Sequence, residues 1–194
     1  ILLFTLTGNG QAENLKIEAK NITLDKKKFI TIFENEVVVK TEDKGTIKSD
    51  YVEYNKNTGL LKLKDNITAA DIKNNIINAK SAQYDEKKRI FLSIGETEII
   101  TAEKYILVGK NIKVDNTKNI ITSKDEALIK DPDGNQIYLD NFEFNLNSNI
   151  FKSIGLVKIE DKMSNSYEFS QIYIDTKKKE ILGTDIKAFL NQDN

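Results

Sequence analysis

The sequence predicts an all-β protein of about a dozen bent strands, arranged as six repeats of 30 residues. Two observations support this fold class. Apolar and polar residues alternate with period two, and no window has the periodicity of a helix. An Asp or Asn also recurs every 30 residues, at Asp25, Asn55, Asp85, Asp115, Asn145 and Asp175.

Composition narrows the classes of function. The 194 residues are 39% hydrophobic, which is enough for a sizeable core, and the net charge of −1 gives no reason to expect a nucleic-acid partner. The chain has no cysteine and no histidine. This excludes disulfides, thiolate or imidazole metal sites and every mechanism that needs a histidine base. Together with the lack of the catalytic motifs considered below, this predicts a protein that is not an enzyme and has no cofactor.

Each repeat begins with a strand that is bent once. In the first repeat, Ile17-x-Ala19 and Ile22-x-Leu24 alternate with period two, and a polar pair between them shifts the phase by one residue. We interpret that pair as a β-bulge or corner that keeps both apolar segments on the inner side. The corner pairs are Lys20-Asn21, Asp50-Tyr51, Lys80-Ser81, Lys110-Asn111, Asp140-Asn141 and Ser170-Gln171. The residues expected to face water are Thr23, Glu53, Gln83, Lys113, Glu143 and Tyr173.

A polar turn and a second strand follow the Asp/Asn position of each repeat. We interpret the Asp or Asn as a turn former, and not as a ladder of catalytic carboxylates. The second strand of the first repeat is expected at Phe29–Phe33, continuing into Val37–Val39. Three of the turns are rich in lysine, which indicates either a solvated surface or contacts with anionic phosphate groups. These turns are Lys26–Lys28, Lys87–Arg89 and Lys177–Lys179.

The segment Asp131–Asn135 resembles the start of a calcium loop. The twelfth position of that loop is Phe142, where a calcium site needs a bidentate Glu. We therefore predict a Pro/Asp-Gly turn and no metal site. No nucleophile elbow, phosphate-binding loop or dinucleotide fingerprint is present in the sequence.

The N-terminal residues 1–12 are predicted to be the remnant of an export signal. Ile1–Leu6 is apolar, and the small residues Gly10 and Ala12 have the spacing of a signal-peptidase site. An edge strand or the end of a transmembrane anchor are the alternatives. We expect the folded domain to comprise residues 13–194.

The repeat unit is similar to the OstA-like repeat of the lipopolysaccharide transport family. The resemblance is carried by Ile17–Asp25, which has the form I-x-A-x-x-I-x-L-D, and by the following Ile30–Val39, with its E-N-x-V-x-V ending. Later repeats keep the first part and lose most of that ending. The resemblance implies an open, V-shaped β-jellyroll whose apolar interior holds lipid acyl chains and whose edges join neighbouring proteins. It implies a non-enzymatic transport protein of the periplasm.

The inner columns of the repeats are the candidate lipid groove. On the residues alone they indicate either an ordinary core or a ligand groove, and the resemblance favours the groove. The candidate groove residues are Ile17, Ala19, Ile22, Leu24, Ile47, Ser49, Val52, Tyr54, Ile77, Ala79, Ala82, Tyr84, Gly109, Ile112 and Val114. One column is small at Ala19, Ser49, Ala79 and Gly109 and large at Leu139 and Phe169, which predicts space in the first two thirds of the chain.

The resemblance also implies partners. These are lipopolysaccharide and other jellyroll proteins, which would pair with the edge strands at 15–24 and 181–190. Asp185–Asn191 is similar to the point where the LptD jellyroll meets its outer-membrane barrel. Within the family we expect the N-terminal periplasmic domain of LptD, truncated before that barrel, with LptA as the next candidate. An LptD domain would be attached to the outer membrane and would add an outer-membrane lipoprotein partner. A carbohydrate-active β-solenoid and a structural adhesin repeat are the alternatives of other classes.

Overall fold

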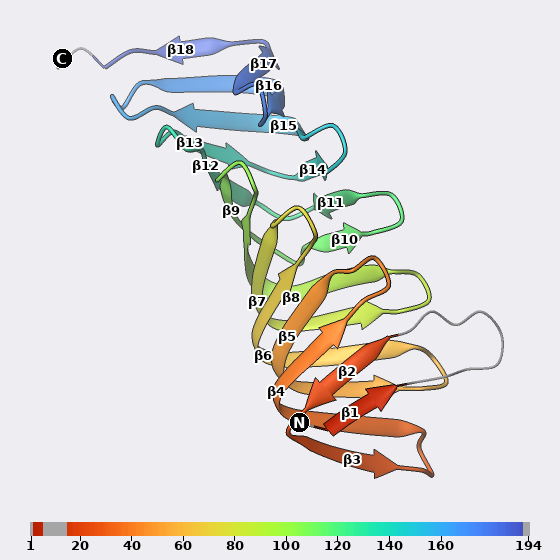
Figure 1. Cartoon of the computed structure of the whole chain (residues 1–194). Helices are drawn as coiled ribbons and strands as arrows, with labels where there is room; N and C mark the ends of the chain where they lie inside the picture. Colours follow the sequence, from red (N-terminus) through yellow and green to blue (C-terminus); the bar gives the residue numbers. More distant parts are fainter. Residues whose placement is uncertain (1, 6–14, 192–194) are drawn as a thin grey trace.

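The structure is a computed structural model, and it describes residues 2–5 and 15–191. Every regular element in these residues is a β-strand (Figure 1). The strands are β1 (Leu2–Thr5), β2 (Lys16–Ala19), β3 (Asn21–Asp25), β4 (Ile30–Lys40), β5 (Thr46–Asn55), β6 (Leu60–Ala70), β7 (Ile76–Asp85), β8 (Ile90–Ile100), β9 (Ile106–Lys110), β10 (Lys113–Asp115), β11 (Ile120–Ser123), β12 (Ala127–Lys130), β13 (Gln136–Leu139), β14 (Phe142–Asn145), β15 (Ile150–Glu160), β16 (Ser166–Asp175), β17 (Glu180–Thr184) and β18 (Lys187–Phe189).

Apart from β1, these elements form twelve long antiparallel strands in one sheet. Five of the long strands are interrupted once, so each carries two labels: β2/β3, β9/β10, β11/β12, β13/β14 and β17/β18. Each long strand pairs with its neighbours in the sequence, as in a meander. β4, β6, β8, β11, β15 and β17 start 30 residues apart, which is the spacing of the sequence pattern.

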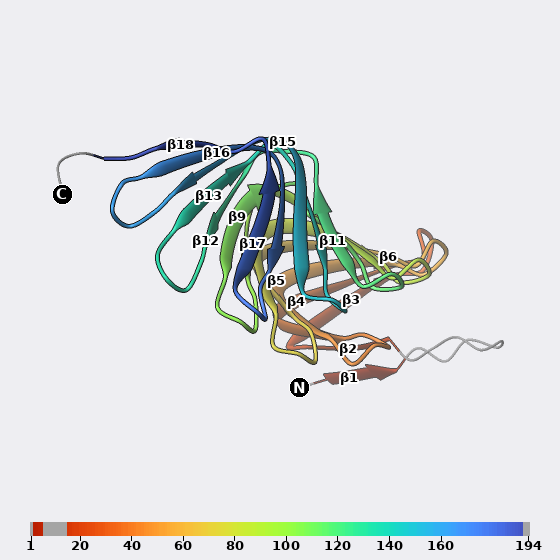
Figure 2. The same cartoon turned by 90° about the horizontal axis from the view of Figure 1, so that it is seen from above.

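Each long strand bends near its middle, so that the sheet has two arms that meet at a vertex. Figure 2 shows this V-shaped cross-section along the stack. The predicted corners lie at the bend: β2 and β3 are separated at Lys20, and the pairing register shifts between Lys48 and Tyr51. The second strands bend too, where Asn35 and Glu36 have φ of 65° and 54°. The predicted all-β, open V-shaped β-jellyroll is therefore confirmed.

One arm ends in a row of four-residue turns, which we call the turn rim (26–29, 56–59, 86–89, 116–119, 146–149 and 176–179). The Asp/Asn position forms these turns as predicted: Asp25 Oδ1 accepts hydrogen bonds from the backbone N–H groups of Lys27 and Lys28. Successive turns are joined by backbone bonds, such as Asn116 N–H to Arg89 O at 3.1 Å. The turn rim is therefore one hydrogen-bonded edge.

The other arm ends in a row of five-residue loops, which we call the loop rim (41–45, 71–75, 101–105, 131–135 and 161–165). Asp131–Asn135 is one of these loops, as the turn interpretation predicts. Asp131 accepts hydrogen bonds from the backbone N–H groups of Asp133 and Asn135 and from the Asn135 side chain. Asp71 and Asp161 do the same in their loops. The carboxylates are therefore occupied by hairpin bonds.

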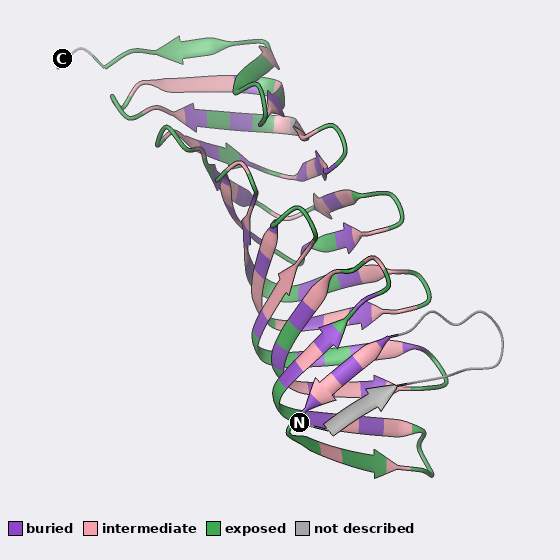
Figure 3. Cartoon of the chain, in the orientation of Figure 1, coloured by how far each residue is buried: buried purple, intermediate pink, exposed green. Residues whose placement is uncertain are grey.

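The core lies between the arms (Figure 3). Side chains on both sides of each bend point inward, as at Ile47 and Val52 of β5 and at Leu107 and Ile112, which flank the bend after β9. The phase shift at the corner explains this, because it returns the apolar positions to the same side of the sheet. None of the six residues predicted to face water is buried.

The two ends of the sheet differ from the interior strands. β1 pairs with β2, with Leu2 opposite Ala19, so the open N-terminal edge is β3 and not the whole predicted edge strand 15–24. At the other end, β16 is the one pairing partner of β17 and β18 among the described residues. Residues 1 and 6–12 of the predicted signal remnant lie outside the described residues, and that assignment stays a prediction.

Candidate functional site

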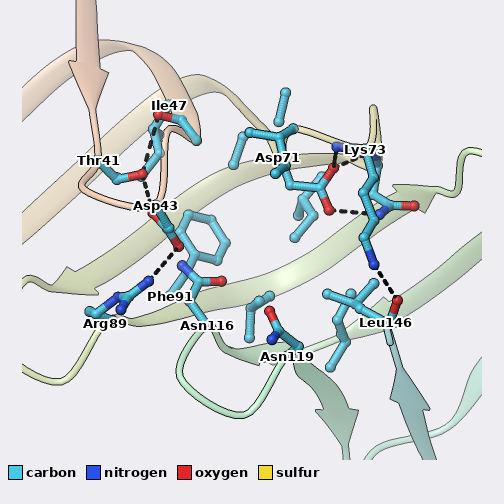
Figure 4. A pocket seen from close by; sticks show the side chains of 18 of the residues that line it. Thr41, Asp43, Ile47, Asp71, Lys73, Arg89, Phe91, Asn116, Asn119 and Leu146 are labelled. Atoms are coloured by element: carbon cyan, nitrogen blue, oxygen red, sulfur yellow. Dashed lines mark hydrogen bonds and ion pairs between the residues drawn. The ribbon is translucent and has the colours of Figure 1, made fainter. Parts of the chain in front are cut away.

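A cavity of about 480 Å³ opens between the two rims in the middle of the stack (Figure 4). Its polar mouth is formed by the loops at 41–45 and 71–75 and by the turns at 86–89, 116–119 and 146–149. Deeper in the V its walls are apolar, and they are formed by Ile47, Ala69, Ile77, Phe91, Val114, Ile121 and Leu146. The cavity is therefore amphipathic, and its volume is typical of a small-ligand site.

Two contacts cross the mouth of this cavity from one rim to the other. The Arg89 guanidinium lies 3.6 Å from Asp43 Oδ2 and 3.9 Å from Glu42 Oε2. Lys73 Nζ donates a hydrogen bond to the carbonyl oxygen of Leu146 at 2.7 Å. Figure 4 shows the two contacts on opposite sides of the opening. The two contacts therefore lie on either side of the entrance to the cavity.

Tyr84 forms part of the cavity wall below the turn rim, and Tyr54 is buried in the core. Tyr84 lines the cavity and is 2% exposed, and burial raises the pKa of its hydroxyl, with a further contribution from Asp43 that Arg89 opposes. Burial also raises the pKa of Tyr54, whose hydroxyl donates to Glu86 Oε2 at 3.0 Å. Both side chains are therefore neutral across the physiological pH range, and Tyr84 adds no charge to the apolar wall.

Four of the fifteen candidate groove residues line this cavity: Ile47, Ile77, Tyr84 and Val114. Others are buried in the continuous core on either side of it, namely Ile17, Ala19, Val52, Tyr54, Ala82 and Ile112. Ile22 and Ala79 are half-buried and pack against that core. Leu24 is 53% exposed because it lies on the open edge strand β3. That these residues meet a lipid stays a prediction.

The column of small residues lies at the vertex and does not line the cavity. Ser49 uses its hydroxyl there to donate to the backbone oxygens of Tyr51 and Lys64. A Cβ on Gly109 would meet Ala127 at 3.4 Å. The large residues near the C-terminus do fill the interior, where the rings of Phe144 and Phe151 stack at 3.9 Å. The cavity is lined by residues between 41 and 147, so it extends beyond the first two thirds of the chain, and the space is at the mouth of the V.

Sequence reasoning missed the part of the site that comes from second strands and loops. Ala69, Phe91 and Ile121 lie on β6, β8 and β11, and their inward positions recur with the same 30-residue period. Aligning the second strands as closely as the first would have found them. The contribution of the loops at 41–45 and 71–75 has no comparable signal, because it depends on the distance between the rims.

The described residues hold no group of three or more acidic side chains placed to bind a metal ion. In the same part of the chain there is no helix long and apolar enough to cross a membrane. The fold and its cavity thus define an open β-jellyroll with an amphipathic opening between its arms.

Comparison with known proteins adds one structural similarity. No family model and no curated protein matches the chain. Among solved structures it is similar to LptH from Pseudomonas aeruginosa, described as the LptA-homologous periplasmic component of the conserved lipopolysaccharide transport device. The sequence identity is 12% and the TM-score 0.27, with 92% of this chain and 96% of that chain covered. A similarity at this TM-score carries no argument about the present chain.

Proposed function

We propose that the protein is a non-enzymatic lipid carrier that shields the acyl chains of lipopolysaccharide between the arms of its V. One observation carries this proposal: the 480 Å³ cavity is apolar in its depth, polar at its mouth, and open between the rims. An amphiphile fits that order, with its chains inside and its headgroup at the rims. Each methylene group moved from water into such a site contributes about 0.8 kcal/mol. The resemblance of the repeat to the OstA-like repeat supports lipopolysaccharide as the ligand.

The two open edges support a role in a chain of jellyroll proteins. Within the part of the chain that the structure describes, the outer edges of β17 and β18 have no pairing strand, and they carry exposed apolar side chains, including Leu182 at 69% exposure. An edge of this kind can accept a strand from a neighbour. We place the protein in the periplasm as one segment of such a bridge. The sequence resemblance favours the LptD domain over LptA, and an LptD domain would have an outer-membrane lipoprotein partner. Both points stay predictions.

Site-specific photo-crosslinking in cells that make lipopolysaccharide tests the carrier function. A photoreactive residue at Ile47 or Ile77, which line the cavity, should capture the lipid. The same residue at Lys113 or Glu143, on the outer face of β10 and β14, is the matched control and should not. Equal labelling of both sets would refute the carrier proposal.

Light scattering tests the edge proposal separately. Leu182→Lys places a charge on the open edge strand β17. The matched control is Tyr138→Lys, which places the same charge on the outer face of β13, a strand inside the sheet. We expect the first variant to reduce association between copies or with other jellyroll proteins, and the second to leave it unchanged. Unchanged association in both variants would exclude this edge as the joint.

A further inference from the structure

The mouth of the cavity holds two cations that come from opposite rims. Arg89 belongs to the turn at 86–89 and Lys73 to the loop at 71–75, and both line the opening (Figure 4). Asn116 and Asn119 lie at the same opening and add amide groups. The mouth therefore holds hydrogen-bond donors together with the carboxylates of Asp43 and Asp71, above an apolar interior.

Arg89 has donors to spare in the present arrangement. Its Nε is buried, and among the described residues it is a buried side-chain nitrogen without a hydrogen-bond partner. Its distances of 3.6 and 3.9 Å to Asp43 and Glu42 are those of a loose ion pair and exceed hydrogen-bond length. Asp43 is also engaged by the Thr41 hydroxyl through its other oxygen, at 2.5 Å. A guanidinium has five N–H donors, and these two loose ion pairs leave part of that capacity unused.

Lys73 is held across the mouth by a neutral acceptor. Its ammonium donates to the Leu146 carbonyl, while the carboxylate of Asp71 in the same loop accepts from the backbone of Lys73 and from Asn75. A phosphate oxygen is a stronger acceptor for an ammonium than a peptide carbonyl, because the hydrogen bond is then charged on both sides. An anion at the mouth would therefore compete well for Lys73.

We propose that Arg89 and Lys73 form a two-point site for the phosphate of an anionic headgroup whose chains occupy the cavity below. This inference rests on the proposed carrier function and names the ligand as a phosphorylated amphiphile. The planar fork of Arg89 suits a phosphate, and Lys73 supplies a point charge from the other side. In the present structure Arg89 contacts the loop rim and Lys73 contacts the turn rim. When the ligand binds, its phosphate replaces Asp43 and the Leu146 carbonyl as the partners of these two cations, so the contacts between the rims break.

Titration of the delipidated full chain with three probes tests the proposal. The probes are dodecyl phosphate, neutral dodecyl maltoside with the same chain, and inorganic phosphate. We expect dodecyl phosphate to bind about tenfold or more tightly than the maltoside, since a hydrogen bond to a charged group is worth more than a neutral one. Arg89→Gln and Lys73→Gln should each weaken binding of dodecyl phosphate much more than binding of the maltoside, and so remove most of that preference.

Two lysines that do not line the cavity provide matched controls. Lys88→Gln removes a charge from the same turn as Arg89, and Lys44→Gln removes one from the loop rim. Both should keep the preference for dodecyl phosphate. Arg89→Lys keeps the charge and loses the fork, and it should retain part of the preference, which keeps the test valid if Arg89→Gln does not fold.

The outcomes separate this inference from the carrier function. If the maltoside binds but dodecyl phosphate binds no more tightly, or if the control variants lose the preference equally, the two-cation site is wrong and the carrier stands. If inorganic phosphate alone binds as tightly as dodecyl phosphate, the site is not one for a lipid headgroup. If neither detergent binds, the carrier function itself fails.

Discussion

Filling the cavity from one wall should block lipid binding and leave the fold intact. Ala69 of β6 lines the cavity beside Ile47 and Ile77, its partners on the neighbouring strands. Ala69→Phe places a ring in open space and displaces the equivalent of about four methylene groups of ligand. At about 0.8 kcal/mol each this is about 3 kcal/mol, or roughly a hundredfold loss of affinity. Titration with a fluorescent alkyl probe measures it.

The matched control is Ala82→Phe on β7. Ala82 is 1% exposed, belongs to the continuous core and does not line the cavity. The same added ring should overpack the core there and cost about 1–3 kcal/mol of stability. In a domain of this size that lowers the midpoint of thermal unfolding by roughly 2–12 °C. Ala69→Phe should leave the midpoint nearly unchanged.

Two results would refute this reasoning. If Ala69→Phe destabilises the fold as much as Ala82→Phe, the opening between the rims is not available space, and the interior is an ordinary dry core. If Ala69→Phe folds normally and binds the probe like the unmodified protein, the ligand does not enter this cavity. A comparison of thermal midpoints and probe affinities for the two variants distinguishes these cases.

Three further predictions concern the fold. Phe144→Ala removes the ring that stacks on Phe151, and it should lower the free energy of unfolding, measured in urea, by about 3–5 kcal/mol. A loss below about 1 kcal/mol would contradict the packing described. Phe29→Gly should raise it by about 1 kcal/mol, because Phe29 is exposed and has a left-handed φ of 56°. The hydrogen bond from the Asn165 side chain lowers the pKa of Asp161 in the folded protein below its ordinary value of 3.8. The carboxylate therefore stabilises the fold above about pH 3.8, and this contribution is lost as the pH falls through the pKa of the folded state. The Asn165 amide resonance should report that transition, and Asp161→Asn should abolish it.

Much of the fold follows from the sequence alone. The alternation around Ile47 and Val52, with its phase shift at Asp50-Tyr51, determines which side chains face inward and where the strand bends. The turns follow from Asp25 and its counterparts, because an Asp or Asn side chain accepts hydrogen bonds from backbone groups two and three residues ahead. These are local interactions, and local interactions leave a periodic record in the sequence.

The site depends on contacts that no local pattern records. Arg89 meets Asp43 across the mouth, and Lys73 reaches Leu146 over 73 positions of the chain. Both contacts depend on how far the two arms open and how the sheet twists along the stack, which is a property of all the strands together. The sequence by itself determined the repeat, the inward columns and the turns. Only the tertiary structure decided where a cavity forms between the arms and which cationic side chains lie at its mouth. Both depend on the separation of the rims, which results from the bends and twists of all the strands together.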